Sequence, residues 1–192
     1  GPIITYDSWK TTKLYSAGKP VVNMEVKIDS QDPQNIVGEI LVKGTNVMLG
    51  YYKNEEATKH VLGPDGWLRT GDLGLIDADG YLFIKGRSKN MILGSSGQNI
   101  YPEEIEGLID NLPYVQESLV VEQDGRLTAL IFPDFDSVDR DEIRTSDLDS
   151  IMEENRVEVN KILPSFSQIA RVKLYPEEFE KTPKRSIKRY LY

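Results

Sequence analysis

Short runs in which apolar and polar positions alternate fill the first part of the chain and predict β-strands there. Residues 38–44 and residues 81–86 form such runs, and the turn sequence Asp-Ala-Asp-Gly leads into the second. Residues 54–59 lie between them and predict a short helix whose N-cap is Asn54. Residues 1 to about 88 are therefore expected to be mostly β-structure.

Apolar residues recur at helical spacing in the second part of the chain. Pro102 stands where a first helical residue is favoured, and an apolar stripe from Ile105 to Leu112 continues the helix. The helix dipole explains the acidic residues of its first turns, for which no acid–base role is predicted: Glu103, Glu104 and Glu106.

Further elements are predicted in the order strand, strand, helix and strand, at residues 115–122, 126–132, 146–163 and 168–175. Asp124-Gly125 is the expected hairpin turn, and the acidic residues 132–146 are expected to form an exposed loop. This order predicts a small α+β domain in which a three-stranded sheet packs with helices. The chain is therefore expected to be mixed α/β, with one domain in residues 1–88 and another in residues 89–192.

Composition narrows the function classes. The 192 residues carry a formal net charge of −8, which argues against a nucleic-acid-binding surface. The chain has no cysteine and a single histidine, His60, so no disulfide, thiol catalysis or metal site is predicted. No apolar run is long enough for a membrane span and no signal-peptide pattern opens the chain, so a cytoplasmic protein is expected.

Several short motifs follow one another in a fixed order: Gly38-Glu39-Ile40, Gly50-Tyr51-Tyr52, Leu68-Arg69-Thr70-Gly71-Asp72, Gly86-Arg87-Ser88-Lys89 and Tyr101-Pro102-Glu103-Glu104-Ile105-Glu106. This order resembles that of the AMP-forming acyl-CoA synthetases, which belong to the adenylate-forming superfamily, and the match covers nearly the whole chain. The resemblance implies that residues 1–88 are a β-rich piece of a distorted antiparallel β-barrel subdomain, the end of a large N-terminal region. It implies that residues 89–192 are the mobile C-terminal domain.

The resemblance also implies that other parts of the enzyme lie upstream. In the family, a Tyr-Gly-x-Thr-Glu motif normally ends just before the position of Gly1-Pro2-Ile3-Ile4, and a phosphate-binding loop lies much farther upstream. The chain is therefore expected to be the C-terminal part of a ligase, inactive by itself.

The implied activity is ATP-dependent activation of a carboxylic acid as acyl-AMP, followed by transfer of the acyl group to coenzyme A. Residues 163–170 and Thr182-Pro183 resemble the long-chain fatty-acid–CoA ligases. The expected small-molecule partners are a fatty acid, ATP and coenzyme A, with Mg²⁺ held mainly by upstream residues. The resemblance is also compatible with a full enzyme that works close to a membrane surface, and the sequence predicts no particular oligomeric state.

The nucleotide-binding candidates are Asp72 and Arg87. Asp72 matches the family aspartate that accepts hydrogen bonds from both ribose hydroxyls, a role that suits a carboxylate with two acceptor oxygens. Arg87 matches the arginine that contacts the ribose side of the nucleotide, where a fixed fork of donors is useful. The alternatives are a turn aspartate after Gly71 and a surface salt bridge made by Arg87.

Two further candidates belong to the moving part of such an enzyme. Lys89 matches the family hinge, where the torsion change of one residue swings the small domain between two catalytic poses. Residues 94–99 resemble the loop that lines the coenzyme A channel, with Gly97 as the first candidate and Ser96 and Asn99 as others. The alternative is a simple flexible connector.

The C-terminal segment departs from the family pattern. The family usually ends with Lys-Thr-x-x-Gly-Lys or Thr-Pro-x-x-Lys, and the last lysine touches the reacting carboxylate and phosphate. Aligned on Lys181-Thr182-Pro183, that position is Ser186, which carries no charge. Lys184 and Lys188 are the candidates to replace it, with Arg185 as a third option. The alternative is a solvated basic tail, or one that pairs with the acidic residues of the domain.

Two other functions are compatible with the sequence. One is an adenylation domain that loads a carrier protein, although no carrier-like helix with a serine follows. Another is a non-catalytic binding module derived from the family, which the serine at position 186 favours and the continuous motifs through Asp72 and Arg87 oppose.

Overall fold

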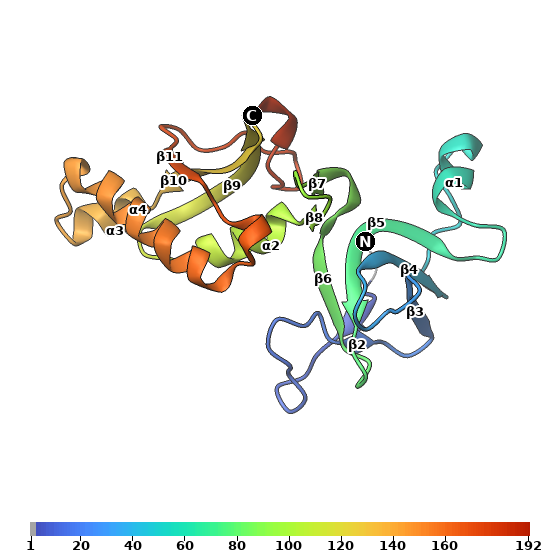
Figure 1. The fold of residues 1–192 in the computed structure, drawn as a ribbon. Helices are drawn as coiled ribbons and strands as arrows, with labels where there is room; N and C mark the ends of the chain where they lie inside the picture. The colour runs from blue at the N-terminus through green and yellow to red at the C-terminus, as the bar shows by residue number, and fades with distance from the viewer. Residues whose placement is uncertain (1–2) are drawn as a thin grey trace. The chain divides into compact units, whose positions relative to one another are not determined.

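The computed structural model describes residues 3–192, so Gly1 and Pro2, next to the expected upstream motif, lie outside the described residues. The chain divides into two compact units, residues 1–89 (unit 1) and residues 90–192 (unit 2). Both units contain strands and helices (Figure 1), and the predicted mixed α/β class is confirmed. The assignment of the two parts to a β-barrel subdomain and a mobile domain stays a prediction.

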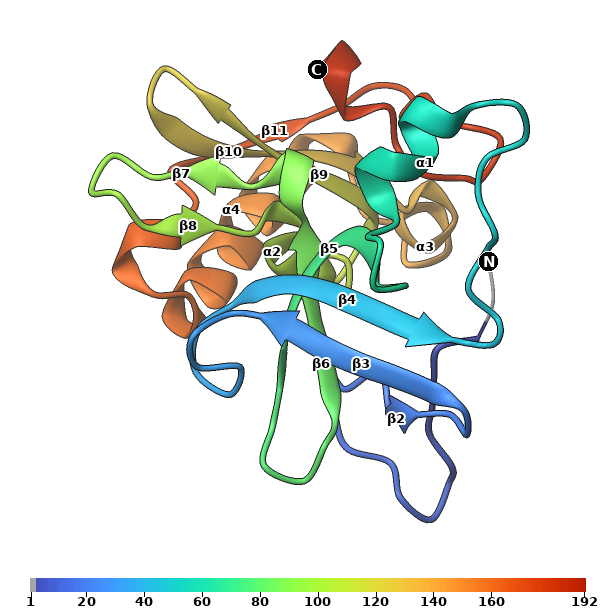
Figure 2. The same ribbon diagram turned by 90° about the vertical axis from the view of Figure 1, so that its right-hand side faces the viewer.

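Unit 1 is built on an antiparallel sheet in the order β3-β4-β5-β6 (Figure 2). Its strands are β3 (Met24–Asp29), β4 (Gly38–Gly44), β5 (Leu68–Ile76) and β6 (Leu82–Arg87), and a separate short pair is formed by β1 (Thr5–Tyr6) and β2 (Lys19–Pro20). Apolar side chains on one face of the sheet form a small core: Met24, Ile28, Ile40, Val42 and Leu82. Strand alternation thus buries one side of the sheet.

The predicted short helix of unit 1 is confirmed as α1 (Glu55–Val61). The side chain of Asn54 accepts a hydrogen bond from the backbone N–H of Ala57 at 3.0 Å. Asn54 therefore satisfies one of the free donors at the helix start, as expected of an N-cap.

Unit 2 contains, in chain order, β7 (Ile92–Leu93), β8 (Asn99–Ile100), α2 (Pro102–Ile109), β9 (Val115–Gln123), β10 (Arg126–Pro133), α3 (Phe135–Arg140), α4 (Thr145–Ile162) and β11 (Arg171–Leu174). Short 3₁₀ turns are η1 (Ser88–Asn90), which begins in unit 1 and ends at the first residue of unit 2, and η2 (Ser165–Ser167) and η3 (Arg189–Leu191) within unit 2. The main sheet has the order β11-β10-β9, in which β10 is antiparallel to β9 and parallel to β11. The strand β9 is consequently an edge strand.

The predicted elements of unit 2 are largely confirmed, with corrections. Asp124 and Gly125 have φ values of 55° and 70°, the left-handed conformations that tight hairpin turns require. The last strand is shorter than expected and covers only residues 171–174. The loop expected at 132–146 is wrong, because α3 forms there: Asp134 caps the helix at the N–H of Ser137, and Val138 anchors it with 3% exposure.

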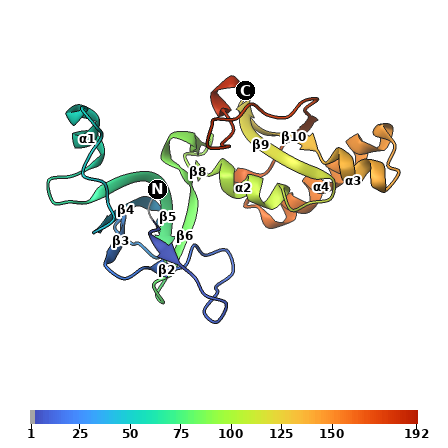
Figure 3. The ribbon, with the colours of Figure 1, turned by 180° about the vertical axis from the view of Figure 1, so that it is seen from behind.

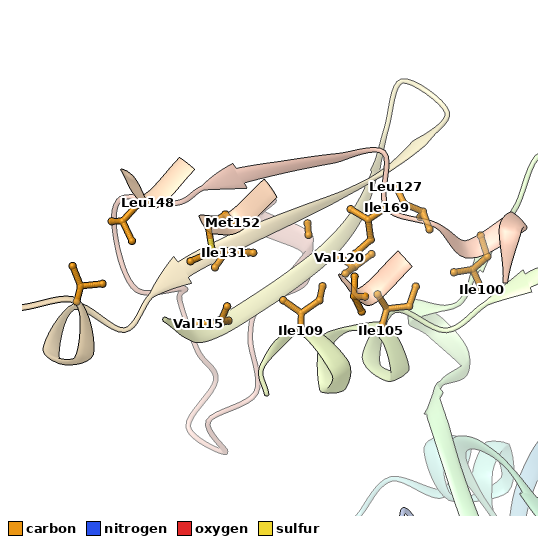
Figure 4. Packing of buried hydrophobic residues seen from close by; sticks show 13 residues of the cluster. Ile100, Ile105, Ile109, Val115, Val120, Leu127, Ile131, Leu148, Met152 and Ile169 are labelled. Carbon is orange, nitrogen blue, oxygen red and sulfur yellow. The ribbon is translucent and has the colours of Figure 1, made fainter. Parts of the chain in front are cut away.

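The helices α2 and α4 cover one face of the main sheet (Figures 1 and 3). Figure 4 shows Ile105 and Ile109 of α2, and Met152 of α4, packed toward Val120 and Ile131 of the strands. The opposite face is covered by side chains of the C-terminal segment, which pack on Leu119 and Leu130: Tyr175, Phe179, Ile187 and Tyr192. The sheet therefore fixes the C-terminal segment through apolar burial.

A buried ion pair also holds the C-terminal segment. Arg189 Nη1 donates to both carboxylate oxygens of Glu106, at 2.8 and 2.9 Å, and Arg189 Nη2 donates to the carbonyl of Val120 at 2.8 Å. Glu106 in turn accepts from the N–H of Val120 at 2.7 Å. The interpretation of Glu106 as a helix-start charge is therefore incomplete, because its side chain is only 11% exposed and is committed to these partners.

The buried carboxyl makes the stability of unit 2 depend on pH. Burial raises the pKa of Glu106 to about 7, a rise that Arg189 and the Val120 N–H oppose and that Glu103 adds to. An unfolded glutamate titrates near 4.5, so between these pH values the folded state binds more protons than the unfolded state. The free energy of unfolding therefore falls as the pH rises through this window, by about 3 kcal/mol.

We expect Glu106→Gln to remove this fall, since glutamine does not titrate. Urea unfolding of both proteins, followed through NMR signals of β9 at several pH values, measures the difference between the two curves. Parallel curves would show that the Glu106 pKa is not raised.

Candidate functional site

Asp72 and Arg87 face each other across neighbouring strands of unit 1. Asp72 lies on β5 directly opposite Arg87 on β6 in the antiparallel register. Arg87 Nη1 donates to Asp72 Oδ1 at 2.5 Å and also to the carbonyl of Thr70 at 3.4 Å. The side chain of Asp72 is 34% exposed and that of Arg87 is 47% exposed. The structure thus brings the two nucleotide-binding candidates together, and Arg87 orients the carboxylate.

The backbone around Asp72 is shaped by irregular pairing. The pairing of β5 with β4 shifts register next to Glu39, and the pairing of β5 with β6 shifts register next to Leu73. Such bulges change the direction of the side chains. Gly71 has φ +73°, a conformation that favours glycine. Thr70 Oγ1 donates to the carbonyl of Ile40 at 2.8 Å and accepts from the N–H of Asp72 at 3.0 Å. These contacts fix the position of Asp72.

Sequence reasoning gave no role to Thr70 or Glu39, although both lie in the quoted motifs. Glu39 accepts from Arg69 Nη1 at 2.7 Å and from the N–H of Gly71 at 3.1 Å. Glu39 therefore ties β4 to the bend that precedes Asp72. The signal in the sequence was the glutamate of Gly38-Glu39-Ile40, one residue before a buried apolar strand position.

A pocket of about 910 Å³ opens beside the carboxylate of Asp72, and all its lining residues belong to unit 1. Apolar side chains such as Ile4, Met48 and Leu68 line it together with the polar groups already described. Asp72 Oδ2 accepts no hydrogen bond from a protein group of residues 3–192. Asp72 thus lines the pocket and keeps one acceptor oxygen without a protein hydrogen bond among residues 3–192, as a carboxylate that binds hydroxyl groups requires.

Lys89 lies at the division between the two units and also lines this pocket. It belongs to η1 and its side chain is exposed. The position agrees with where a hinge was expected, and its role as a hinge stays a prediction.

Residues 94–98 form the loop that joins β7 to β8 in unit 2 (Figure 2), and Asn99 is the first residue of β8. The N–H of Gly97 donates to the carbonyl of Gly94 at 2.9 Å, and the side chain of Ser96 donates to that of Gln98. Gly97 has φ +83° with open space around the position of a Cβ, so the turn itself accounts for this glycine. Ser96 and Asn99 are exposed. The channel role of all three candidates stays a prediction.

The C-terminal candidates lie on and beside a tight turn, residues 181–187. Lys181 and Ile187 form an antiparallel bridge, and the N–H of Arg185 donates to the carbonyl of Thr182 at 2.8 Å. Arg185 has φ +61°. Arg185 therefore adopts the left-handed conformation that favours glycine, at the position where one of the two family patterns has glycine.

The basic residues of this turn differ in their partners. Within residues 3–192, the side chains of Lys184 and Arg185 make no hydrogen bond or ion pair, and both are exposed. Lys188 Nζ lies 2.9 Å from Glu180, and this contact raises the Lys188 pKa. Ser186 is exposed. The structure thus engages Lys188 in an ion pair and leaves the ammonium of Lys184 exposed on the turn.

Residues 3–192 contain no group of three or more histidine, cysteine, aspartate or glutamate side chains placed to hold a metal ion. None of the helices in this range has the length and apolar character needed to cross a membrane.

The fold and the site define a class of protein. The family described as AMP-binding enzyme C-terminal domain matches residues 89–191, more than half of the chain. The chain therefore belongs to this family of AMP-binding enzymes, within the adenylate-forming superfamily.

Two curated relatives are similar to this chain in sequence. The 2-succinylbenzoate–CoA ligase of Bacillus cytotoxicus is 45% identical over 113 residues, which cover 57% of this chain and 23% of that protein. The indoleacetate–CoA ligase of Aromatoleum aromaticum is 44% identical over 119 residues, which cover 60% of this chain and 22% of that protein. The chain thus spans about a quarter of the length of these relatives.

A solved structure extends the similarity to the fold. The O-succinylbenzoate coenzyme A synthetase of Bacillus subtilis, in complex with ATP and magnesium ion, superposes with a TM-score of 0.76 at 29% identity. The superposition covers 97% of this chain and 38% of that one.

Proposed function

We propose that this chain forms part of an AMP-forming ligase that activates a carboxylic acid as acyl-AMP and passes the acyl group to coenzyme A. The observation that carries the proposal is the carboxylate of Asp72, a residue that lines the pocket: Arg87 holds one oxygen, and the other accepts no hydrogen bond from residues 3–192. Membership in the AMP-binding enzymes supports it.

The proposed chemistry has two steps. The carboxylate of the acid attacks the α-phosphate of ATP and pyrophosphate leaves, and the thiol of coenzyme A then displaces AMP from the acyl-AMP. Asp72 would accept hydrogen bonds from the ribose hydroxyls in both steps, and Arg87 would hold its carboxylate in place. Lys184 would supply the positive charge that stabilises the reacting carboxylate and phosphate.

The acid is proposed to carry an aromatic ring. The curated relatives named above act, by their names, on 2-succinylbenzoate and indoleacetate. The long-chain fatty acid expected from the sequence finds no support in these names, since neither relative is named for such an acid. Mg²⁺ and coenzyme A belong to the proposal as the partners that such ligases use.

The proposal is tested with the complete enzyme that contains this chain. We expect it to release pyrophosphate and form a thioester with 2-succinylbenzoate or indoleacetate at least about tenfold more efficiently than with palmitate. The isolated 192 residues are expected to form no acyl-AMP, because they span only about a quarter of the length of the ligases they match.

Each other outcome has a definite meaning. Preference for palmitate would overturn the aromatic acid and leave the ligase in place. Transfer to a carrier protein in place of coenzyme A would favour a carrier-loading domain. No acyl-AMP with any acid would favour a non-catalytic binding module.

A further inference from the structure

Both arms of the C-terminal turn are attached to the edge strand β9. Lys181, on the arm that enters the turn, forms an ion pair with Glu117 of β9, and each of these side chains is 23% exposed. Arg189, just beyond the arm that leaves the turn, binds Glu106 and the carbonyl of Val120. Two side-chain contacts therefore attach the turn to β9.

The contact made by Arg189 restricts the orientation of the turn more than the contact made by Lys181. Nη1 of Arg189 contacts both carboxylate oxygens of Glu106, and Nη2 donates to the backbone carbonyl of Val120 in β9. The Arg189 side chain is 20% exposed. A planar fork held by both a carboxylate and a carbonyl has a single orientation. Since Glu106 is itself bound to the Val120 N–H, the whole group is locked to the strand.

The ion pair is better suited to fixing geometry than to adding stability. The free energy needed to remove a carboxylate and a guanidinium from water offsets much of the free energy gained from their attraction. The apolar contacts of Phe179 and Tyr192 already bury this segment against the sheet. What the ion pair adds is a defined direction for the chain that leaves the turn.

We propose that Arg189 and Glu106 are positioning residues for acyl-AMP formation, which hold the 181–187 turn so that Lys184 is presented in one orientation. The inference rests on the proposed function, because the use of Lys184 in adenylation gives the turn its purpose. Neither Arg189 nor Glu106 is assigned a contact with the substrates.

Unit 2 offers a matched control in Arg156. Its guanidinium also binds a carboxylate, Glu153 at 2.9 Å, and a backbone carbonyl, that of Ile169 at 2.9 Å. Its side chain is 23% exposed, close to that of Arg189, but its partners are on α4 and before β11. Arg156→Gln therefore removes a comparable contact at another place.

Amide hydrogen exchange, measured by NMR on the chain itself, tests the positioning. The reporters are the N–H groups of Thr182, Arg185 and Lys188, which are bonded to carbonyls within or beside the turn. We expect Arg189→Gln to speed their exchange about tenfold, Arg189→Lys to have an intermediate effect, and Arg156→Gln to change it less than about twofold. Amides of β10 report global opening in the same spectra.

Unchanged exchange at the three turn amides would overturn the proposal. Equal acceleration of the turn and β10 amides would also overturn it, since that shows a general loss of stability. Because this measurement needs no activity, it gives its answer even if the ligase proposal fails.

The role in catalysis is tested in the complete enzyme. Arg189→Gln is expected to lower kcat for acyl-AMP formation about tenfold, with little change in KM for ATP and little change in the thioester step. Arg156→Gln is the control that leaves both steps unchanged. If the turn loosens and acyl-AMP forms at the normal rate, the positioning role in adenylation is wrong.

Discussion

Replacing Asp72 by alanine in the complete enzyme is expected to lower kcat/KM for ATP by about 100-fold or more. Asp72 lines the pocket, its Oδ2 accepts no hydrogen bond from residues 3–192, and Arg87 orients the carboxylate. Two hydrogen bonds from ribose hydroxyls to a charged acceptor would be lost, each worth about 1.5–3 kcal/mol. Since the nucleotide is bound in both half-reactions, acyl-AMP formation and thioester formation should both slow. Initial rates at varied ATP measure the effect.

A matched control is Asp29→Ala. Asp29 is also an exposed carboxylate near an arginine, with 3.6 Å to Arg69 Nη2, but it does not line the pocket with Asp72. Its loss should leave the ATP kinetics unchanged. Neither substitution should unfold unit 1, because exposed ion pairs contribute less than about 1 kcal/mol. An unchanged KM for ATP in Asp72→Ala would remove Asp72 from the nucleotide site.

Replacing Lys184 by alanine is expected to slow acyl-AMP formation about 100-fold while thioester formation from preformed acyl-AMP continues. The Lys184 ammonium is exposed on the turn and has no protein partner within residues 3–192. Removing one fixed group that stabilises developing negative charge costs about 2.7–4 kcal/mol, and the lower end of this range corresponds to about 100-fold in rate. Pyrophosphate release and acyl transfer, assayed separately, measure the two steps.

Lys188→Ala is the comparison. Because Lys188 is held by Glu180, its loss should lower the rate by less than about fivefold. Adding Ser186→Lys to the Lys184→Ala variant should restore acyl-AMP formation, because it places a positive charge at the position where the family usually has its lysine. If neither Lys184→Ala nor Lys188→Ala slows the step, neither of these two lysines compensates for Ser186.

The sequence predicted those elements whose signals are local. Alternation, an N-cap asparagine, a proline at the first helical position and the Asp124-Gly125 turn each act within a few residues, and each is confirmed. The helix α3 was missed because it is short, its surroundings are acidic, and a single buried side chain, Val138, fixes it to the core. Burial of that kind depends on tertiary packing and leaves little periodicity in the sequence.

The candidate site was predictable where residues lie on paired strands. Asp72 and Arg87 were chosen by their motifs, and the β5–β6 register places them face to face. The ion pairs of the C-terminal turn were not predictable in detail. Arg189 and Glu106 are 83 residues apart in the chain, and no local rule selects Glu106 over its acidic neighbours. Only the alternative that this basic segment pairs with acidic residues anticipated the contacts.

The unpaired edge of β9 has a consequence for how the protein behaves in solution. An edge strand offers unpaired backbone groups to which a strand of another molecule can add. At Val120, in the middle of β9, the N–H is occupied by Glu106 and the carbonyl by Arg189. An incoming strand would have to displace a charged pair to continue the ladder. The side chains that hold the C-terminal turn are therefore expected also to disfavour the addition of another strand at this part of β9.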